Sequence, residues 1–148
     1  MLLYILGFLC LLLTGFVNAT PFETCPGLPP PVEVIAHCGD ILPCKLPQNT
    51  NANVNITFNI PHDVETGKID IRALMGIEVP FIPPDNNLCH ALTNGYCPLE
   101  KGERITYNMV LPILKYYPAI ALKLKISFMD ESKNVLSCFQ MAAKVVKY

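Results

Sequence analysis

Apolar and polar side chains alternate without a break in Val54-Asn55-Ile56-Thr57-Phe58-Asn59-Ile60. Because successive side chains of a β-strand point to opposite faces, this segment predicts a strand with one buried and one solvated face. Asn55-Ile56-Thr57 is also an acceptor sequence for N-linked glycosylation, and the alternation turns Asn55 outward, where a sugar can be attached. The segment is typical of an antiparallel sheet that is covered on one side only.

The same period of two returns on both sides of this segment. It is found in residues 32–37, 69–81, 105–111, 120–128 and 139–145. Gly76 allows a bulge or bend within the second of these runs, and Pro112 interrupts the third. Proline, glycine and aspartate clusters lie between the runs and predict turns. Six or seven short, half-buried strands indicate an all-β protein, an antiparallel β-sandwich of two sheets with their apolar faces turned toward each other.

The composition excludes several classes of protein. The chain has 148 residues, a net charge of −1, 51% hydrophobic and 16% charged residues, and 14 prolines. This length suffices for one domain with a hydrophobic core, and the apolar content is too high for a disordered chain. A charge near zero argues against nucleic acid as a partner, and the prolines argue against a helix bundle.

Residues 1–19 contain no charged side chain, and Leu2 to Leu13 is an almost unbroken apolar run. The run is shorter than the roughly 20 residues that a membrane-spanning helix needs. Small residues follow it in Val17-Asn18-Ala19. We therefore predict a secretory signal peptide over residues 1–19, cleaved before Thr20, and a single mature domain over residues 20–148.

Cleavage would remove Cys10 and leave an even number of cysteines. The six that remain are Cys25, Cys38, Cys44, Cys89, Cys97 and Cys138. An even number in a secreted chain predicts disulfides, and six cysteines allow 15 pairings. Turn residues make Cys38–Cys44 and Cys89–Cys97 geometrically easy, which would leave Cys25 for Cys138. Neither short spacing is typical of a structural zinc site.

Motifs for catalysis, metals or cofactors are missing. No serine lies in a nucleophile elbow, and the chain has no metalloprotease motif, phosphate-binding loop or dinucleotide fingerprint. The three histidines are far apart in the sequence and share no metal-ligand spacing. The sequence therefore predicts a protein that is not an enzyme and that uses no metal and no cofactor.

Several sequence blocks resemble a known family. They are Val79-Pro80-Phe81-Ile82-Pro83, then Cys97-Pro98-Leu99-Glu100-Lys101-Gly102-Glu103, then Leu111-Pro112-Ile113, and then Tyr117-Pro118. In this order, and together with the six cysteines, they resemble the Niemann–Pick type C2 proteins of the ML (MD-2-related lipid-recognition) domain. The resemblance covers essentially the whole mature chain.

The resemblance implies an immunoglobulin-like sandwich whose sheets are splayed around an internal apolar cavity. It implies the disulfides Cys25–Cys138, Cys38–Cys44 and Cys89–Cys97. Residues that match the cavity mouth of the sterol-carrying members are Phe81, Ile113, Tyr117 and Pro118. From the alternation beside these blocks, we expect the cavity wall to include Ile77, Val79, Met109 and Leu111.

The function that follows is that of a monomeric carrier of sterols, fatty acids or similar hydrophobic small molecules. We expect it to be secreted or lysosomal and to make transient contact with membranes or with a membrane receptor or transporter. Two alternatives come from other members of the family: transport of fatty acids or semiochemicals in chemical communication, and recognition of microbial lipids in innate immunity.

Overall fold

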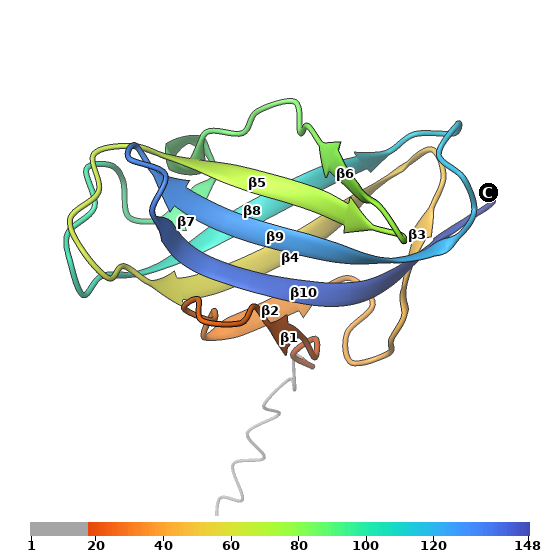
Figure 1. Ribbon diagram of the computed structural model, residues 1–148, viewed down its shortest axis with the longest axis horizontal. Helices are drawn as coiled ribbons and strands as arrows, with labels where there is room; N and C mark the ends of the chain where they lie inside the picture. Colours follow the sequence, from red (N-terminus) through yellow and green to blue (C-terminus); the bar gives the residue numbers. More distant parts are fainter. Residues whose placement is uncertain (1–17) are drawn as a thin grey trace, which may run out of the picture.

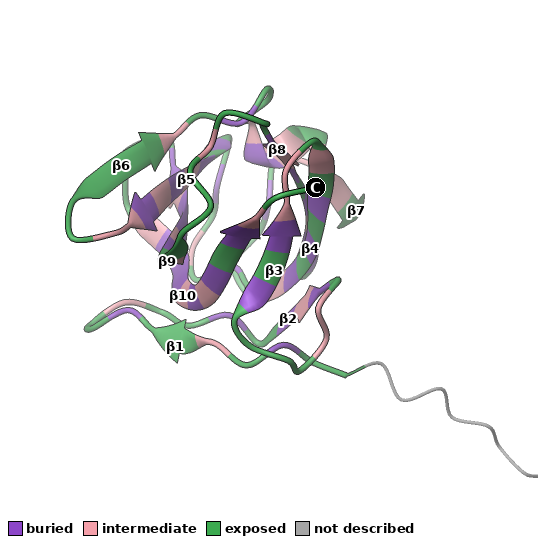
Figure 2. Cartoon of the chain, turned by 90° about the vertical axis from the view of Figure 1, so that its right-hand side faces the viewer, coloured by how far each residue is buried: buried purple, intermediate pink, exposed green. Residues whose placement is uncertain are grey.

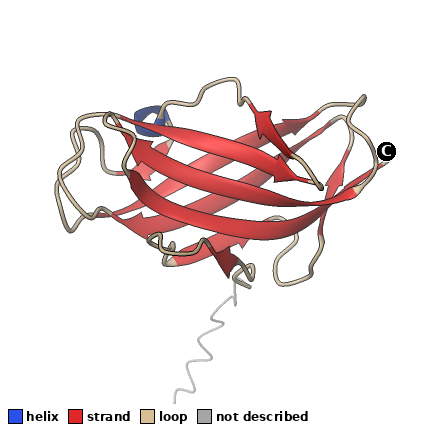
Figure 3. Ribbon diagram, viewed as in Figure 1, coloured by secondary structure: helices blue, strands red, loops and turns tan. Residues whose placement is uncertain are grey.

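Two β-sheets face each other in the computed structural model, which describes residues 18–148 (Figure 1). Residues 1–17 lie outside the described residues, so the predicted signal peptide and Cys10 are not placed by it. Apart from a single 3₁₀ turn, every regular element of the described chain is a strand (Figure 3). The all-β prediction is confirmed.

The larger sheet has six strands. Its order is β1 (Glu23–Thr24), β10 (Val135–Val146), β9 (Ala121–Asp130), β5 (Gly67–Leu74) and β6 (Glu78–Phe81), with β3 (Cys44–Pro47) also paired to β10. The strands are antiparallel with one exception, since β3 runs parallel to β10. The alternation predicted antiparallel sheets, and the β3–β10 pair is the one parallel exception among the described strands.

The smaller sheet has four antiparallel strands. Its order is β2 (Glu33–Ala36), β4 (Thr50–Asn59), β8 (Arg104–Ile113) and β7 (Leu92–Asn94). The 3₁₀ turn η1 (Leu88–His90) precedes β7. The alternating segment 54–60 forms most of β4, and its even-numbered residues from Val54 to Ile60 are buried.

The core lies between the sheets and is formed by the inward residues of the long strands. Burial alternates along these strands, as Figure 2 shows by its changing colours. Phe58 of β4 stacks on Phe128 of β9 with 4.5 Å between ring centroids, and Tyr107 of β8 meets the same ring edge to face at 5.2 Å. Aromatic contacts from both sheets therefore hold this part of the sandwich closed.

Residues 69–81 form a hairpin, where the sequence predicted one run with a bulge or bend. Gly76 has a φ of +86°, a value that L residues rarely adopt, and the Met75 N–H donates to the Ile77 carbonyl at 3.0 Å. The chain reverses here, so that β6 pairs with β5 and Val79 lies opposite Ala73. As a result, Ile77 belongs to an exposed turn and not to a strand.

Pro112 lies inside β8, which continues to Ile113 and does not stop as predicted. The Asn108 N–H points away from β4, toward the Ala91 carbonyl at 2.9 Å. Because the direction of the backbone nitrogen repeats every second residue, the nitrogens of Val110 and Pro112 also point away from β4. Because β7 does not extend this far, no ladder bond is lost at Pro112.

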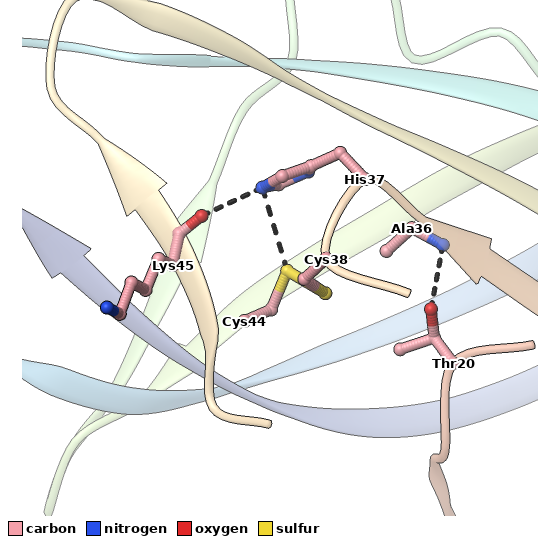
Figure 4. The surroundings of a disulfide bond; sticks show 6 residues. All are labelled: Thr20, Ala36, His37, Cys38, Cys44 and Lys45. Carbon is pink, nitrogen blue, oxygen red and sulfur yellow. Dashed lines mark hydrogen bonds between the residues drawn. A yellow bond between two sulfur atoms is a disulfide. The ribbon is translucent and has the colours of Figure 1, made fainter. Parts of the chain in front are cut away.

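The three predicted disulfides are present. Cys25–Cys138 joins residues 113 positions apart and ties the N-terminal segment to β10, and Cys89–Cys97 closes the loop around β7. Cys38–Cys44 closes the connection from β2 to β3 (Figure 4). Beside it, His37 Nε2 donates to the Lys45 carbonyl at 2.8 Å.

The described residues contain no helix long and apolar enough to cross a membrane.

Candidate ligand-binding hollow

A hollow of about 250 Å³ lies between the two sheets. Strands of the six-stranded sheet, strand β8 of the four-stranded sheet and the loop from β8 to β9 all contribute to its wall. The lining residues are Leu46, Ala73, Met75, Val79, Phe81, Leu111, Ile113, Tyr117, Pro118, Leu122, Leu124 and Val145. Because these side chains point inward from facing sheets, the hollow continues the sandwich core, where the sheets stay apart.

The chemistry of the wall is almost purely apolar. Each lining side chain is a hydrocarbon or a thioether, and Tyr117 adds one hydroxyl. Two other hollows have mixed walls: one of about 310 Å³ includes Lys68 and Asp130, and one of about 560 Å³ includes Asp85 and His90. The 250 Å³ hollow is therefore the one whose walls match an apolar guest.

Two aromatic rings from different elements meet at the hollow. Phe81, at the end of β6, contacts Tyr117 of the β8–β9 loop edge to face, with 5.3 Å between the ring centroids. Tyr116 also contacts Tyr117 edge to face, with 5.4 Å between centroids. Both Phe81 and Tyr117 are only half-buried, while Tyr116 is exposed. Phe81 and Tyr117 thus form a partly exposed edge of the hollow.

No charged side chain lines the hollow. Burial raises the pKa of the Tyr117 hydroxyl above its usual value, and the neighbouring Tyr116 contributes in the same direction. The hydroxyl therefore stays protonated through the physiological range. It can donate one hydrogen bond to a polar group of a ligand that is otherwise hydrophobic.

Six of the eight residues that the sequence named for the ligand site lie around this hollow: Phe81, Ile113, Tyr117, Pro118, Val79 and Leu111. Ile77 does not, because the hairpin turn leaves it 70% exposed. Met109 does not either, since it is 2% exposed and lies deeper along β8, within the packed core. The structure thus separates residues that the alternation had grouped together.

Six lining residues were not named as site residues from the sequence: Leu46, Ala73, Met75, Leu122, Leu124 and Val145. Most of them occupy apolar positions of the predicted strands, so the alternation did place them inside. It gave no information on which end of each strand lies where the sheets separate. Leu46 lies on β3, a four-residue strand too short to give a period.

The predicted glycosylation acceptor is accessible. Asn55 is exposed on the outer face of β4, and its Oδ1 accepts a hydrogen bond from Asn108 Nδ2 at 2.8 Å. Its own amide nitrogen, the atom to which a sugar is attached, takes no part in this bond. Among residues 18–148 no group of three or more His, Cys, Asp or Glu side chains is arranged to hold a metal ion.

Comparison with known proteins places this architecture in a family. A model of the ML domain matches residues 19–145. A relative from Drosophila melanogaster, named NPC intracellular cholesterol transporter 2 homolog a, is 30% identical over 104 residues, which cover 69% of each chain. The chain belongs to the Niemann–Pick type C2 family of ML-domain proteins. As a member of that family it is not an enzyme.

Solved structures agree with the Niemann–Pick type C2 fold. The crystal structure of a Niemann–Pick type C2 protein from Japanese carpenter ant superposes with a TM-score of 0.77 at 22% identity, covering 85% of this chain and 99% of that chain. Chicken MD-1 complexed with lipid IVa superposes with a TM-score of 0.53 at 10% identity, covering 83% of this chain and 87% of that chain. These two matches concern the fold alone.

Proposed function

We propose that this protein binds and transfers a lipid, held in the 250 Å³ hollow between its sheets. The observation that carries the proposal is the composition of the wall, in which twelve residues from both sheets and one loop contribute no charged side chain. A wall of this kind stabilises a bound ligand mainly by removing apolar ligand surface from water. A guest with roughly 400 Å² of apolar surface would gain about 10 kcal/mol before the costs of association.

The relatives support a lipid as the guest. The Drosophila melanogaster relative is named a cholesterol transporter homolog, and the chicken MD-1 structure contains lipid IVa. We assign the site to a sterol, or to a fatty acid or similar hydrophobic small molecule. Met75 and Phe81 suit several apolar shapes, because a thioether chain and a half-buried ring can both adjust to the guest.

The contact with a membrane or receptor is proposed to involve the rim beside the mouth. We use "rim" for the exposed apolar residues of the β5–β6 turn, β6 and the β8–β9 loop, which are Ile77, Val79, Leu114, Tyr116 and Ile120. Exposed apolar groups that gather beside a ligand site are typical of an interaction surface. In this proposal Ile77 serves docking, which accounts for a position that faces solvent and not the ligand.

The proposed location is outside the cell or in the lysosome, and the proposed state is a monomer. Cleavage before Thr20 fits the structure, because Thr20 is the first buried residue of the described chain. Its N–H donates to the Val34 carbonyl at 2.7 Å. Figure 4 shows its second bond, in which its hydroxyl accepts from the Ala36 N–H at 2.9 Å. The mature chain would thus begin with an anchored residue, with a glycan on the exposed Asn55.

Extraction of the secreted protein tests the function directly. Native mass spectrometry of the protein should show an added mass that organic solvent removes, and the extract identifies the lipid. Titration of the delipidated protein with a fluorescent sterol and a fluorescent fatty acid then compares the two classes. Absence of a bound lipid together with no saturable uptake of either probe would refute the proposal. Binding that requires a bacterial lipid would favour the immune alternative.

A further inference from the structure

The loop that carries Tyr117 has few attachments to the body of the protein. It covers residues 114–120, between β8 and β9, and all of these residues except Tyr117 are exposed. Two of its backbone bonds are internal, from the Tyr117 N–H to the Leu114 carbonyl at 3.1 Å and from the Ile120 N–H to the Pro118 carbonyl at 3.0 Å. At its end, the Val145 N–H donates to the Ile120 carbonyl at 3.0 Å. Its middle therefore depends on whatever holds Tyr117.

Gln48 supplies that hold from a distant part of the chain. Its Nε2 donates to the Tyr117 carbonyl at 2.7 Å, across a sequence separation of 69 residues. Within residues 18–148, this is the one hydrogen bond from a side chain to the 114–120 loop. This hydrogen bond holds the backbone of Tyr117, the residue whose ring contacts Phe81, and so limits how far the ring can move.

The turn that bears Gln48 is itself firmly attached. The Gln48 N–H donates to the Val146 carbonyl of β10 at 2.9 Å, and the Asn49 N–H donates to the Ile113 carbonyl of β8 at 2.7 Å. The Thr50 hydroxyl donates to the Pro47 carbonyl at 2.6 Å and closes the turn. Because β10 and β8 belong to different sheets, this turn bridges the sandwich and gives Gln48 a rigid base.

We infer that Gln48 is a positioning residue that holds the Tyr117 loop over the hollow and thereby sets the rate at which ligand enters and leaves. This inference rests on the proposed lipid-binding function. Gln48 does not line the hollow, so its loss removes no contact with the ligand. Release of the loop would let the Tyr117 ring move away from Phe81 and open the mouth.

The consequence is kinetic more than thermodynamic. A mouth that opens more often speeds both entry and exit, so the dissociation rate changes more than the dissociation constant. For Gln48→Glu, which keeps the shape of the side chain and replaces its N–H donor by a carboxylate facing a carbonyl, we expect release about three- to tenfold faster. A residue with a merely structural role would lower the melting temperature and leave the rates of ligand entry and release unchanged.

The experiment uses the full mature protein and stopped-flow transfer of a fluorescent sterol, or of a fluorescent fatty acid if that is the probe that binds. Gln48→Glu and Gln48→Ala are compared with Gln140→Glu, which makes the same change on the outer face of β10. Hydrogen exchange of residues 114–120 in the ligand-free protein gives a second measurement that needs no ligand. Both Gln48 variants should show faster exchange there and faster release of the probe.

The outcomes separate the two proposals. Wild-type protein that binds the probe, with release and loop exchange unchanged in both Gln48 variants, overturns the role of Gln48 alone. Wild-type protein that binds neither probe overturns the function and this inference together. If Gln48→Glu does not fold, the Gln48→Ala variant decides by the same two measurements.

Discussion

The ring of Phe81 stands nearly perpendicular to that of Tyr117, with 74° between their planes and 5.3 Å between their centroids. Phe81 comes from the six-stranded sheet, and Tyr117 from a loop that leaves the four-stranded sheet. The contact therefore joins the two layers at the mouth of the hollow. In the proposed function, it is a contact that opens to admit the ligand and closes again after binding.

Replacement of Phe81 should weaken ligand binding in proportion to the apolar lining area that is removed. Phe81 lines the hollow, and burial of apolar surface is worth about 25 cal/mol per Å², so the loss of roughly 20–50 Å² of ligand contact in Phe81→Leu should raise the dissociation constant of a fluorescent sterol or fatty acid roughly two- to tenfold. Phe81→Ala removes more of the lining area and should have the larger effect. Ile82→Ala is the control, because Ile82 is 84% exposed and does not line the hollow. Equal affinity of wild type and Phe81→Ala would remove Phe81 from the site.

Filling the hollow should abolish binding without unfolding the protein. Ala73 lies on β5 and lines the hollow, so Ala73→Leu adds three carbon atoms to space that a ligand would occupy. We expect affinity to fall at least about tenfold, while the melting temperature is kept or raised, as for other cavity-filling changes. Ala142→Leu, on the other face of β10, should alter neither. Undiminished uptake by Ala73→Leu would place the ligand elsewhere.

Gly67 should tolerate no side chain. A Cβ at this position would lie 2.7 Å from Leu88 Cδ2 and 2.7 Å from the Met129 carbonyl oxygen. The backbone oxygen belongs to the neighbouring strand β9 and cannot move aside easily. We expect Gly67→Ala to lower the free energy of unfolding by about 1–3 kcal/mol. Urea denaturation measures this, with Thr66→Ala at the exposed adjacent position as the control; a change below about 0.5 kcal/mol would contradict the packing described.

Asp130 should make the stability depend on pH. Burial raises the pKa of its carboxyl, but hydrogen bonds from His62, Asn134 and Ser132 more than offset this, so the pKa lies below its usual value. A carboxyl with a lowered folded-state pKa stabilises the fold above its unfolded pKa of about 3.9, and the effect is lost as the pH falls through the folded value.

Asp130→Asn should therefore be less stable than wild type above about pH 5, and the difference should shrink as the pH falls below about 4. Thermal denaturation between pH 7 and pH 2.5 measures the difference. Asp40→Asn, at an exposed position, serves as the control. A constant difference over this range would show that the carboxylate charge plays no part.

The disulfides should contribute unequally to the free energy of unfolding. Cys25–Cys138 closes a loop with a separation of 113 residues, and Cys38–Cys44 one of only 6. Since the entropy that a cross-link removes from the unfolded chain grows with the logarithm of loop length, loss of the first should cost about 2.5 kcal/mol more. Replacing each pair by serine and measuring denaturant unfolding tests this order. A larger cost for the short loop would indicate that native contacts around Cys44 matter more than chain entropy.

The alternation of side chains determined the strands and their inward faces, because a period of two follows from the geometry of a single strand. It placed Val54, Phe58 and Leu111 in the interior, and they are buried. The family resemblance predicted the disulfides and four of the residues around the hollow, which are Phe81, Ile113, Tyr117 and Pro118, and the alternation added Val79 and Leu111. These features depend on the local chain or on the family pattern, so they were accessible without coordinates.

Only the tertiary structure decided the roles of residues whose position depends on a second, distant segment of the chain. Ile77 faces solvent because β6 folds back on β5, and Met109 lies in the core because side chains of the facing strands pack around it. Gln48 has no pattern around it that indicates a role, since its partner is a carbonyl 69 residues away. Whether a buried side chain faces a packed core or an open hollow is set by the distance between the sheets, and no single strand encodes that distance.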